Sequence, residues 1–205
     1  MPTESLQRRP GARPGVGIVH LGLGAFFRAH GAIYVAEAMA ASGGDWGIRA
    51  ASLQTSSTRD ALAPQGYAYV ALEAGPQGEG ARAGEGIEDG LVAPENPAAL
   101  IAAMADPAVK IVSLTVTEKG YCHNPATSAL NLDHPDIQHD LTAPLPRSAP
   151  GYLVRALAAR RAAGLRPFTV LTCDNLPHNG AVARGVVIAL AQQIDPALAD
   201  WIAAE

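Results

Sequence analysis

The chain has 205 residues, enough for one α/β domain with a full hydrophobic core. Hydrophobic residues make up 48% of it and charged residues 17%, which is typical of a compact soluble protein and excludes global disorder. The net charge of -4 and a pI near 5.8 argue against a nucleic-acid partner.

Residues 1–15 carry arginines but no apolar segment of the kind a secretory signal has, and we expect a disordered tail there. No apolar run reaches the ~20 residues of a membrane span, so no membrane partner is expected. Cys122 and Cys173 are too few for a disulfide framework and indicate free thiols in a cytoplasmic protein. The histidines and cysteines lack metal-ligand spacing, so no metal site is expected.

From residue 16 on, segments of strand character alternate with segments of helix character. Strands are expected at Val16–Leu21, Gly47–Leu53, Tyr67–Glu73, Val109–Val116 and Phe168–Cys173, the last of them buried. Helices are expected at Phe27–Ala40, after an N-cap at Ser57 or Thr58, at Asn96–Met104, at Gly151–Ala163 with Gly164 as its stop, at Ala181–Gln193 and at Pro196–Ala203. Residues 75–90 predict a mobile loop or irregular hairpin, and residues 117–137 predict mostly loop.

This alternation predicts an α/β fold of the Rossmann type: a doubly wound, mostly parallel sheet with helices on both faces, in one domain over residues 16–205. Ligands of such sheets bind beyond the carboxyl ends of the strands. Three loops are expected at that edge, namely Gly22–Arg28, Thr115–Tyr121 and Asp174–Gly180.

The first of these loops has the outline of a phosphate-binding turn. Its glycines let the chain bend sharply and bring backbone N–H groups to a pyrophosphate, at the positive end of the following helix. Arg28 can reach a phosphate, whereas Phe27 stands where a third glycine would permit close helix–strand contact. The candidate cofactor-binding residues here are Gly22, Leu23, Gly24, Ala25, Phe26, Phe27 and Arg28. A merely structural turn is the alternative.

The other two loops carry the remaining polar candidates. Lys119 beside Glu118 is either a general base of lowered pKa or, as the sequence favours, an ordinary exposed ion pair. Asn175 has an amide that can donate to a developing alkoxide or a substrate carbonyl, or it makes only an Asx turn.

The end of the second expected strand bears on the choice of cofactor. An acid there would hold the ribose 2′-hydroxyl of NAD, but the chain has no acid between Leu53 and Arg59. Arg59 and the neighbouring hydroxyls can accommodate the 2′-phosphate of NADP, or the hydroxyls only cap a helix. The choice between NAD and NADP stays open.

Four motifs in order, "IVHLGLGAFFRAH", "SLTVTEKGYC", "LDHPDIQHDL" with "SAPGYLVRAL", and "PFTVLTCDNLPHNG", resemble the mannitol dehydrogenase family of long-chain polyol-specific dehydrogenases. The resemblance covers nearly the whole chain from Val16. The stretch from "EKGYCHNPAT" to "LDHPDIQHDL" is similar to the fructuronate reductase (mannonate oxidoreductase) branch.

The resemblance implies metal-independent transfer of hydride between NAD and a secondary alcohol of a polyol or sugar acid. It implies that residues 22–28 wrap the pyrophosphate, that Thr117, Glu118 and Lys119 lie near the nicotinamide, and that Asn175 is a catalytic residue that stabilises the substrate oxygen. In the family a C-terminal helical domain supplies the general-base lysine and most substrate contacts. Lys119 is therefore not the family's catalytic lysine.

This chain departs from the family at Phe27, where histidine is usual. We expect the N-terminal, cofactor-binding domain of such an enzyme, with the C-terminal catalytic domain absent and little turnover alone. The alternatives are a non-catalytic nucleotide-binding module that serves as a partner subunit, and an S-adenosylmethionine methyltransferase. The latter normally has an acid leading into its glycine loop, where this chain has His20 and Leu21.

Overall fold

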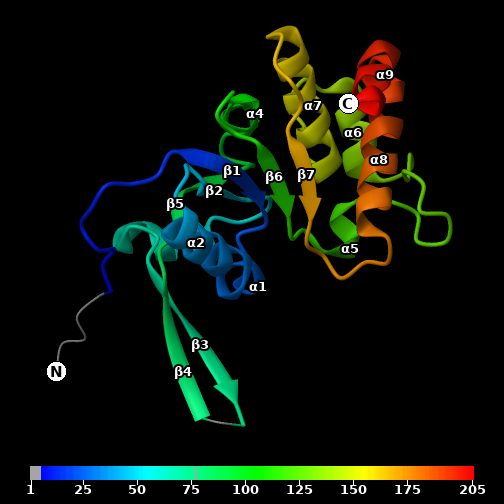
Figure 1. The fold of residues 1–205 in the computed structure, drawn as a ribbon. Helices are drawn as coiled ribbons and strands as arrows, with labels where there is room; N and C mark the ends of the chain where they lie inside the picture. The colour runs from blue at the N-terminus through cyan, green and yellow to red at the C-terminus, as the bar shows by residue number, and fades with distance from the viewer. Residues whose placement is uncertain (1–5, 77) are drawn as a thin grey trace.

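The computed structural model describes residues 6–76 and 78–205. Its centre is a sheet of five parallel strands in the spatial order β5-β2-β1-β6-β7 (Figure 1). These strands are β1 (Val16–Leu21), β2 (Gly47–Ser52), β5 (Ile87–Val92), β6 (Ile111–Leu114) and β7 (Thr169–Thr172). Counted along the chain, the order is third, second, first, fourth, fifth, as in a doubly wound dinucleotide-binding sheet. The predicted fold class is confirmed.

Helices connect the strands and flank the sheet. They are α1 (Ala25–Ala29), α2 (Gly31–Ser42), α3 (Ser57–Leu62) with a 3₁₀ turn at Ala63–Gln65, α4 (Pro97–Ala105), α5 (Thr117–Gly120), α6 (Pro135–Thr142), α7 (Ala149–Ala162), α8 (Asn179–Ile194) and α9 (Pro196–Ala204). Within the described ranges, none is both long and apolar enough to span a membrane.

The sheet is apolar on both faces, and alternate residues of β1 pack against opposite faces. Val19 and Leu21 pack into a core with α4, α7 and α8, whereas Ile18 packs into a second core with α1 and α2. A strand covered on both faces reads as a continuous apolar run, which is why the sequence of β1 identifies it. His20 is the polar exception in that run, and it is fully buried.

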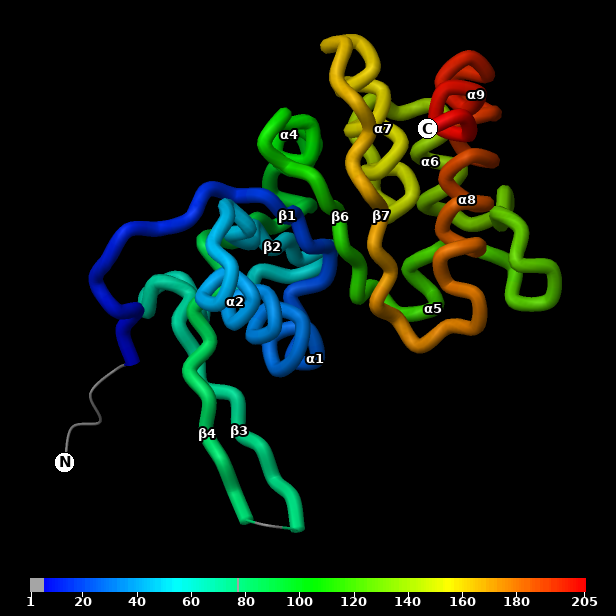
Figure 2. Tube along the Cα trace, viewed as in Figure 1, coloured from blue at the N-terminus to red at the C-terminus, as the bar shows by residue number. Residues whose placement is uncertain are grey.

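Two strands, β3 (Tyr69–Gly75) and β4 (Gly78–Gly84), pair as an antiparallel hairpin that projects from the body (Figure 2). The strand expected at Tyr67–Glu73 is therefore present but stands outside the main sheet. For residues 75–90 the expectation was partly wrong: β4 fits a hairpin, but β5 is a sheet strand that was missed. One face of the hairpin leaves Leu72 81% exposed.

Residues 6–15 have no helix or strand, yet they make specific contacts, contrary to the expected disorder. Arg8 donates to Oε1 of Glu88 at 2.6 Å and to the Ile87 carbonyl at 2.7 Å. Arg9 pairs with Glu85. This stretch, the N-terminal strap, therefore lies against β5, an edge strand of the sheet. Residues 1–5 lie outside the described part.

Several helices differ from their predicted bounds. The helix expected at Phe27–Ala40 is two helices, because the backbone of His30 leaves the helical region at ψ -80°. The N-cap of α3 is Ser56 instead of Ser57 or Thr58, and its side chain makes no capping bond. Residues 117–137, expected to be mostly loop, contain α5 and the first residues of α6.

The predicted stop at Gly164 is confirmed. Gly164 has φ +67°, its N–H donates to the Arg161 carbonyl, and the next N–H, of Leu165, donates to the Arg160 carbonyl. This is the Schellman arrangement that ends a helix with a left-handed glycine.

Strand β7 is the one that differs most from its expected environment. Its apolar sequence predicted a buried strand, but β7 is an edge strand and Leu171 is 47% exposed. Phe168, just before it, is buried.

Candidate cofactor site

Three loops meet at the carboxyl edge of the sheet, as predicted. In the strand register Leu21 lies beside Leu114, and Leu114 lies beside Thr172, so the loops after β1, β6 and β7 begin at the same level. Between β1 and β6 the strand order reverses, which is where doubly wound sheets bind ligands. Figure 1 shows α1, α5 and the β7–α8 loop along this edge.

The two glycines of the first loop have different tasks. Gly22 has φ +108°, and a Cβ there would lie 2.2 Å from the Thr115 carbonyl oxygen, so only glycine fits. Its N–H donates to the Ala51 carbonyl at 2.8 Å, and the N–H of Gly24 donates to the Gly22 carbonyl at 2.7 Å. Gly24 is exposed, and a Cβ there would meet nothing within 4 Å. Gly22 therefore lets the turn pack closely against Thr115, whereas Gly24 leaves the outer surface of the turn open.

Helix α1 begins directly after Gly24. The first N–H bonded along the helix is that of Arg28, to the Gly24 carbonyl, so the N–H groups of Ala25, Phe26 and Phe27 precede the helical ladder. Phe26 is 60% exposed. Arg28 donates from Nη1 to the Leu23 carbonyl at 2.8 Å, so one end of its guanidinium fastens the turn from within.

Phe27 does not face the loop surface. Its ring is buried and stacks on His20, with centroids 3.3 Å apart and planes 8° from parallel. The expectation that Phe27 binds cofactor is therefore corrected for its side chain, which belongs to the core beneath the turn. Only its backbone N–H remains available to a ligand.

His20 lies below the turn, at the last but one position of β1. Its Nδ1 is 2.8 Å from Ser113 Oγ, and its Nε2 is 2.9 Å from the Gly22 carbonyl and 2.8 Å from Thr115 Oγ1. Burial lowers the pKa of His20 to about 3, and the bond to Gly22 opposes this only in part. His20 is therefore neutral and does not transfer protons at ordinary pH.

A carboxylate holds the second loop against the third. Asp174 accepts from the N–H groups of Val116 and Thr117 at 3.0 and 2.9 Å, and from the Tyr121 hydroxyl at 2.8 Å. These contacts hold Thr117 in a left-handed conformation, φ +65°. Burial, assisted by the Asp174 carboxylate, raises the pKa of Tyr121, so the phenol stays a donor.

Thr117, Glu118, Lys119 and Asn175 are all exposed at this edge. Among the described residues, Lys119 forms no ion pair with Glu118, so neither sequence-based reading of that pair is supported by a contact. Asn175 follows Asp174 directly. The amide of Asn179 ties this loop to the end of β7, because it donates to the carbonyls of Thr172 and Asp174.

Sequence reasoning did not assign a site role to His20 or to Asp174. Each had a signal: His20 is a polar residue inside a buried strand, and Asp174 directly follows another strand. Their partners lie 93, 95 and 58 residues away in the chain, so the contacts themselves are visible only in the fold.

Arg59, in α3 beyond the end of β2, is already paired. It bonds Asp60 at 2.5 Å and Glu95 at 2.9 Å, so its charge is balanced by two carboxylates.

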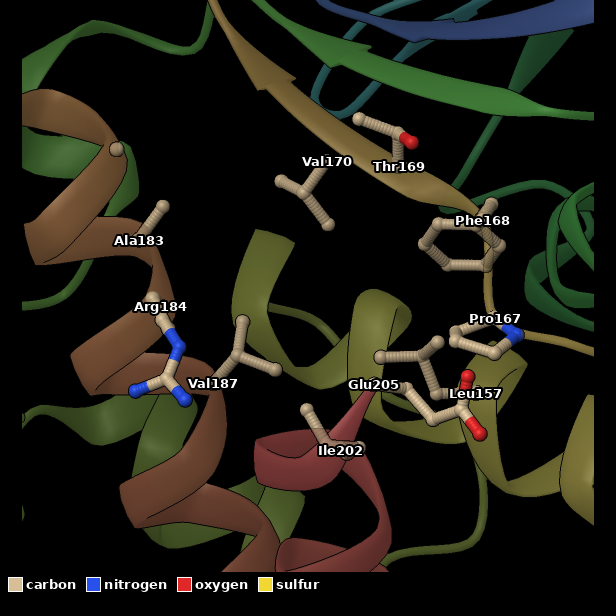
Figure 3. Close-up of a pocket in the computed structure, with 11 residues that line it drawn as sticks. Leu157, Pro167, Phe168, Thr169, Val170, Ala183, Arg184, Val187, Ile202 and Glu205 are labelled. Atoms are coloured by element: carbon tan, nitrogen blue, oxygen red, sulfur yellow. The ribbon is translucent and has the colours of Figure 1, made fainter.

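Two other kinds of site were sought. No group of three metal-binding side chains occurs in residues 6–76 and 78–205. A cavity of about 360 Å³ lies between β7, α7, α8 and α9, lined among others by Leu157, Phe168, Val187 and Ile202 (Figure 3). Its lining includes none of the candidate cofactor-binding or catalytic residues, and only Gly180, at the end of the third loop, belongs to the carboxyl edge.

Comparison with known proteins agrees with this geometry. The model of the mannitol dehydrogenase Rossmann domain matches residues 16–205. The chain is 48% identical over 191 residues to a mannitol 2-dehydrogenase of Phaeosphaeria nodorum, covering 91% of this chain and 34% of that protein. It is 47% identical to the uncharacterized oxidoreductase YeiQ of Escherichia coli, covering 90% and 38%.

Two solved structures have the same fold. The Pseudomonas fluorescens mannitol 2-dehydrogenase, in a ternary complex with NAD and D-mannitol, has a TM-score of 0.88 and 42% identity, covering 94% of this chain and 40% of that one. A D-sorbitol dehydrogenase in substrate-free form has a TM-score of 0.90 and 38% identity, covering 98% and 43%. This chain thus spans about two fifths or less of the relatives named here. It belongs to the mannitol dehydrogenase family and carries that family's Rossmann domain.

Proposed function

We propose that this domain binds NAD(H) and forms the cofactor half of a dehydrogenase that interconverts a secondary alcohol of a polyol or sugar acid and its ketone. The observation that carries the proposal is the meeting of the Gly22–Arg28 turn, the Thr117–Lys119 segment and Asn175 at the switch point of the sheet. Membership of the mannitol dehydrogenase family supports it.

The turn fits a pyrophosphate. The open surface over Gly24 admits a phosphate close to the backbone, and the N–H groups at the start of α1 are donors of the kind that phosphates bind. The binding residues in this proposal are Gly22, Leu23, Gly24, Ala25, Phe26, the backbone of Phe27, and Arg28. When bound, the nicotinamide supplies or accepts the hydride.

At the other end of the site, Thr117, Glu118 and Lys119 lie beside the nicotinamide in this proposal. Asn175 donates from its amide to the substrate oxygen that carries charge during hydride transfer. Asp174 connects the two, because its carboxylate holds the loop of Thr117 while its backbone leads into Asn175. The carboxylate thus fixes Asn175 relative to the Thr117–Lys119 segment.

NAD is favoured over NADP. The P. fluorescens relative was solved with NAD. A 2′-phosphate near Arg59 would compete with Asp60 and Glu95 for the guanidinium and would face their negative charge.

For the substrate, mannitol with fructose is the favoured pair. The P. nodorum and P. fluorescens relatives are named mannitol 2-dehydrogenases. The fructuronate–mannonate pair suggested by the "EKGYCHNPAT" stretch is the second pair to test.

The proposal is tested by calorimetric titration of the 205-residue chain with NADH and with NADPH. We expect NADH to bind and NADPH to bind more weakly. Binding of neither dinucleotide would contradict the proposal, and tighter binding of NADPH would overturn the preference for NAD.

We further propose that residues 1–205 alone have little or no turnover. His20 is neutral and buried, and the resemblance implies that the proton-transferring lysine of these enzymes lies in their C-terminal domain. Assays with NADH and fructose or fructuronate, and with NAD+ and mannitol, should show only background rates. Robust turnover would show that the 205 residues hold a complete site.

A further inference from the structure

His20 is a buried polar group that the proposed chemistry does not use. It is enclosed where the loops after β1 and β6 leave the sheet, and its partners lie on both sides of that point. Ser113 belongs to β6, whereas Gly22 and Thr115 belong to the two loops that follow the strands.

The hydrogen bonds determine which ring nitrogen carries the proton. A backbone carbonyl only accepts, so Nε2, 2.9 Å from the Gly22 oxygen, must be the N–H donor. In a neutral imidazole Nδ1 is then an acceptor, and the Ser113 hydroxyl at 2.8 Å donates to it. The Thr115 hydroxyl also donates to the Gly22 carbonyl, at 2.9 Å, and its oxygen lies 2.8 Å from Nε2. The ring is therefore locked in one tautomer.

Phe27 covers this network from the helix side. Its ring lies flat on the imidazole, and a Cβ at Gly31 would lie 2.7 Å from Phe27 Cε2. Gly31 therefore leaves the space that lets the phenylalanine ring lie between the imidazole and α2. Because the stack excludes water, the three bonds of His20 form in a buried setting, where an unpaired partner is costly.

We propose that His20 is a positioning residue for the cofactor-binding turn: it fixes the Gly22 carbonyl to β6 and to Thr115 and so sets the orientation of the Gly22–Gly24 backbone. The proposal rests on the proposed function for its ligand. The same carbonyl accepts the N–H of Gly24, so the path from His20 to the open phosphate surface is two hydrogen bonds long.

If His20 only filled space in the core, any flat ring of similar size could replace it. His20→Phe keeps a flat ring for the stack on Phe27 and removes both nitrogens. We expect the Kd for NADH to rise at least tenfold in a chain that remains folded. His20→Gln restores one donor and one acceptor, and we expect its Kd to return to within about threefold of the wild-type value.

Tyr152→Phe is the matched control. It also removes a buried polar group, a hydroxyl on α7 that donates to the Ala93 carbonyl at 3.4 Å and makes no hydrogen bond to the three loops. We expect its Kd for NADH to stay unchanged. Equal Kd values for wild type and His20→Phe, measured well below both melting temperatures, would reduce His20 to a core residue and overturn the proposal.

A second readout does not depend on any ligand. Nitrogen NMR of the imidazole should show Nε2 protonated and Nδ1 unprotonated, and hydrogen exchange of the Gly22 and Gly24 amides should speed up in His20→Phe relative to global unfolding. If the wild-type chain fails to bind NADH, the proposed function fails. The NMR and exchange measurements then decide by themselves whether His20 positions the turn. Unchanged exchange at both glycines, or the opposite tautomer, would overturn it.

Discussion

At the scale of single residues, the candidate cofactor site is shaped mainly by buried or half-buried side chains that hydrogen-bond its loops. Asp174 is the clearest case, because one carboxylate accepts two backbone N–H groups and a phenol. A carboxylate has only acceptors, so it suits a position surrounded by donors.

Asp174→Asn should therefore lower the free energy of unfolding by about 1–3 kcal/mol, because the amide NH₂ would face donors instead of accepting from them. We also expect a weaker affinity for NADH, since the Thr117 loop loses its anchor. Asp195→Asn is the control: Asp195 caps α9 by accepting the Ala197 N–H, which an asparagine oxygen can also accept, and its exposed pair with Arg161 contributes little. Urea unfolding and NADH titration check both variants, and equal effects of the two would contradict this account of Asp174.

The pKa of His20 gives a second prediction at this scale. Burial lowers it to about 3 in the folded chain, against 6.5 when unfolded, so the unfolded state binds an extra proton between these values. Neutral His20 makes its full contribution to the free energy of unfolding above about pH 6.5. Below that pH the free energy of unfolding falls by about 1.4 kcal/mol per pH unit.

Between pH 7 and pH 5, wild type should therefore lose about 2 kcal/mol more stability than His20→Phe, which has no such proton to bind. Urea unfolding of both proteins at the two pH values measures the difference. Equal losses would mean that His20 is not buried as a neutral ring.

At the scale of elements, apolar patterning predicts strands and helices that are buried, and it fails where charges are paired across the fold. β5 reads "IEDGLV" and looks like loop, but Glu88 is paired with Arg8, and Asp89 with Arg49 of the neighbouring strand. α6 is polar and begins at His134, whose Nδ1 accepts the Asp136 N–H, a cap that sequence rules do not favour. β7 was predicted as a strand, but its place at the sheet edge depends on topology, which an apolar run does not report.

The N-terminal strap gives the prediction for this scale. Arg8 and Glu88 are 12% and 6% exposed, so Glu88→Gln leaves a nearly buried guanidinium without its carboxylate. We expect the free energy of unfolding to fall by about 3 kcal/mol. Arg9→Gln, at the exposed pair with Glu85, should cause no measurable change. If Glu88→Gln is as stable as wild type, the strap is not held by this pair.

At the scale of the whole molecule, the fold and the position of the three loops were predictable from the sequence. The side-chain contacts that hold these loops in place were not. Alternating strands and helices predict a parallel sheet joined by right-handed crossovers, and the loops that follow its strands then lie at one edge. The glycines of the turn could be assigned because their role depends on local geometry. The roles of His20, Phe27 and Asp174 depend on partners that only the assembled sheet brings together.

The domain is also a part of something larger in its relatives, since it spans about two fifths or less of those named above. The half of the site described here would position a dinucleotide and the substrate oxygen. We propose that the other part of such an enzyme supplies proton transfer and most substrate contacts.

The most direct test of the central claim is the affinity of the Gly24→Val variant for NADH. A Cβ at Gly24 would meet nothing within 4 Å, and the backbone there, at φ -84° and ψ 169°, is one that valine adopts, so the variant should fold as wild type. Gly75→Val, equally open but on the hairpin, is the control. We predict that Gly24→Val loses at least tenfold in affinity while Gly75→Val binds as wild type. NADH affinity unchanged by Gly24→Val would contradict the placement of the dinucleotide on this turn.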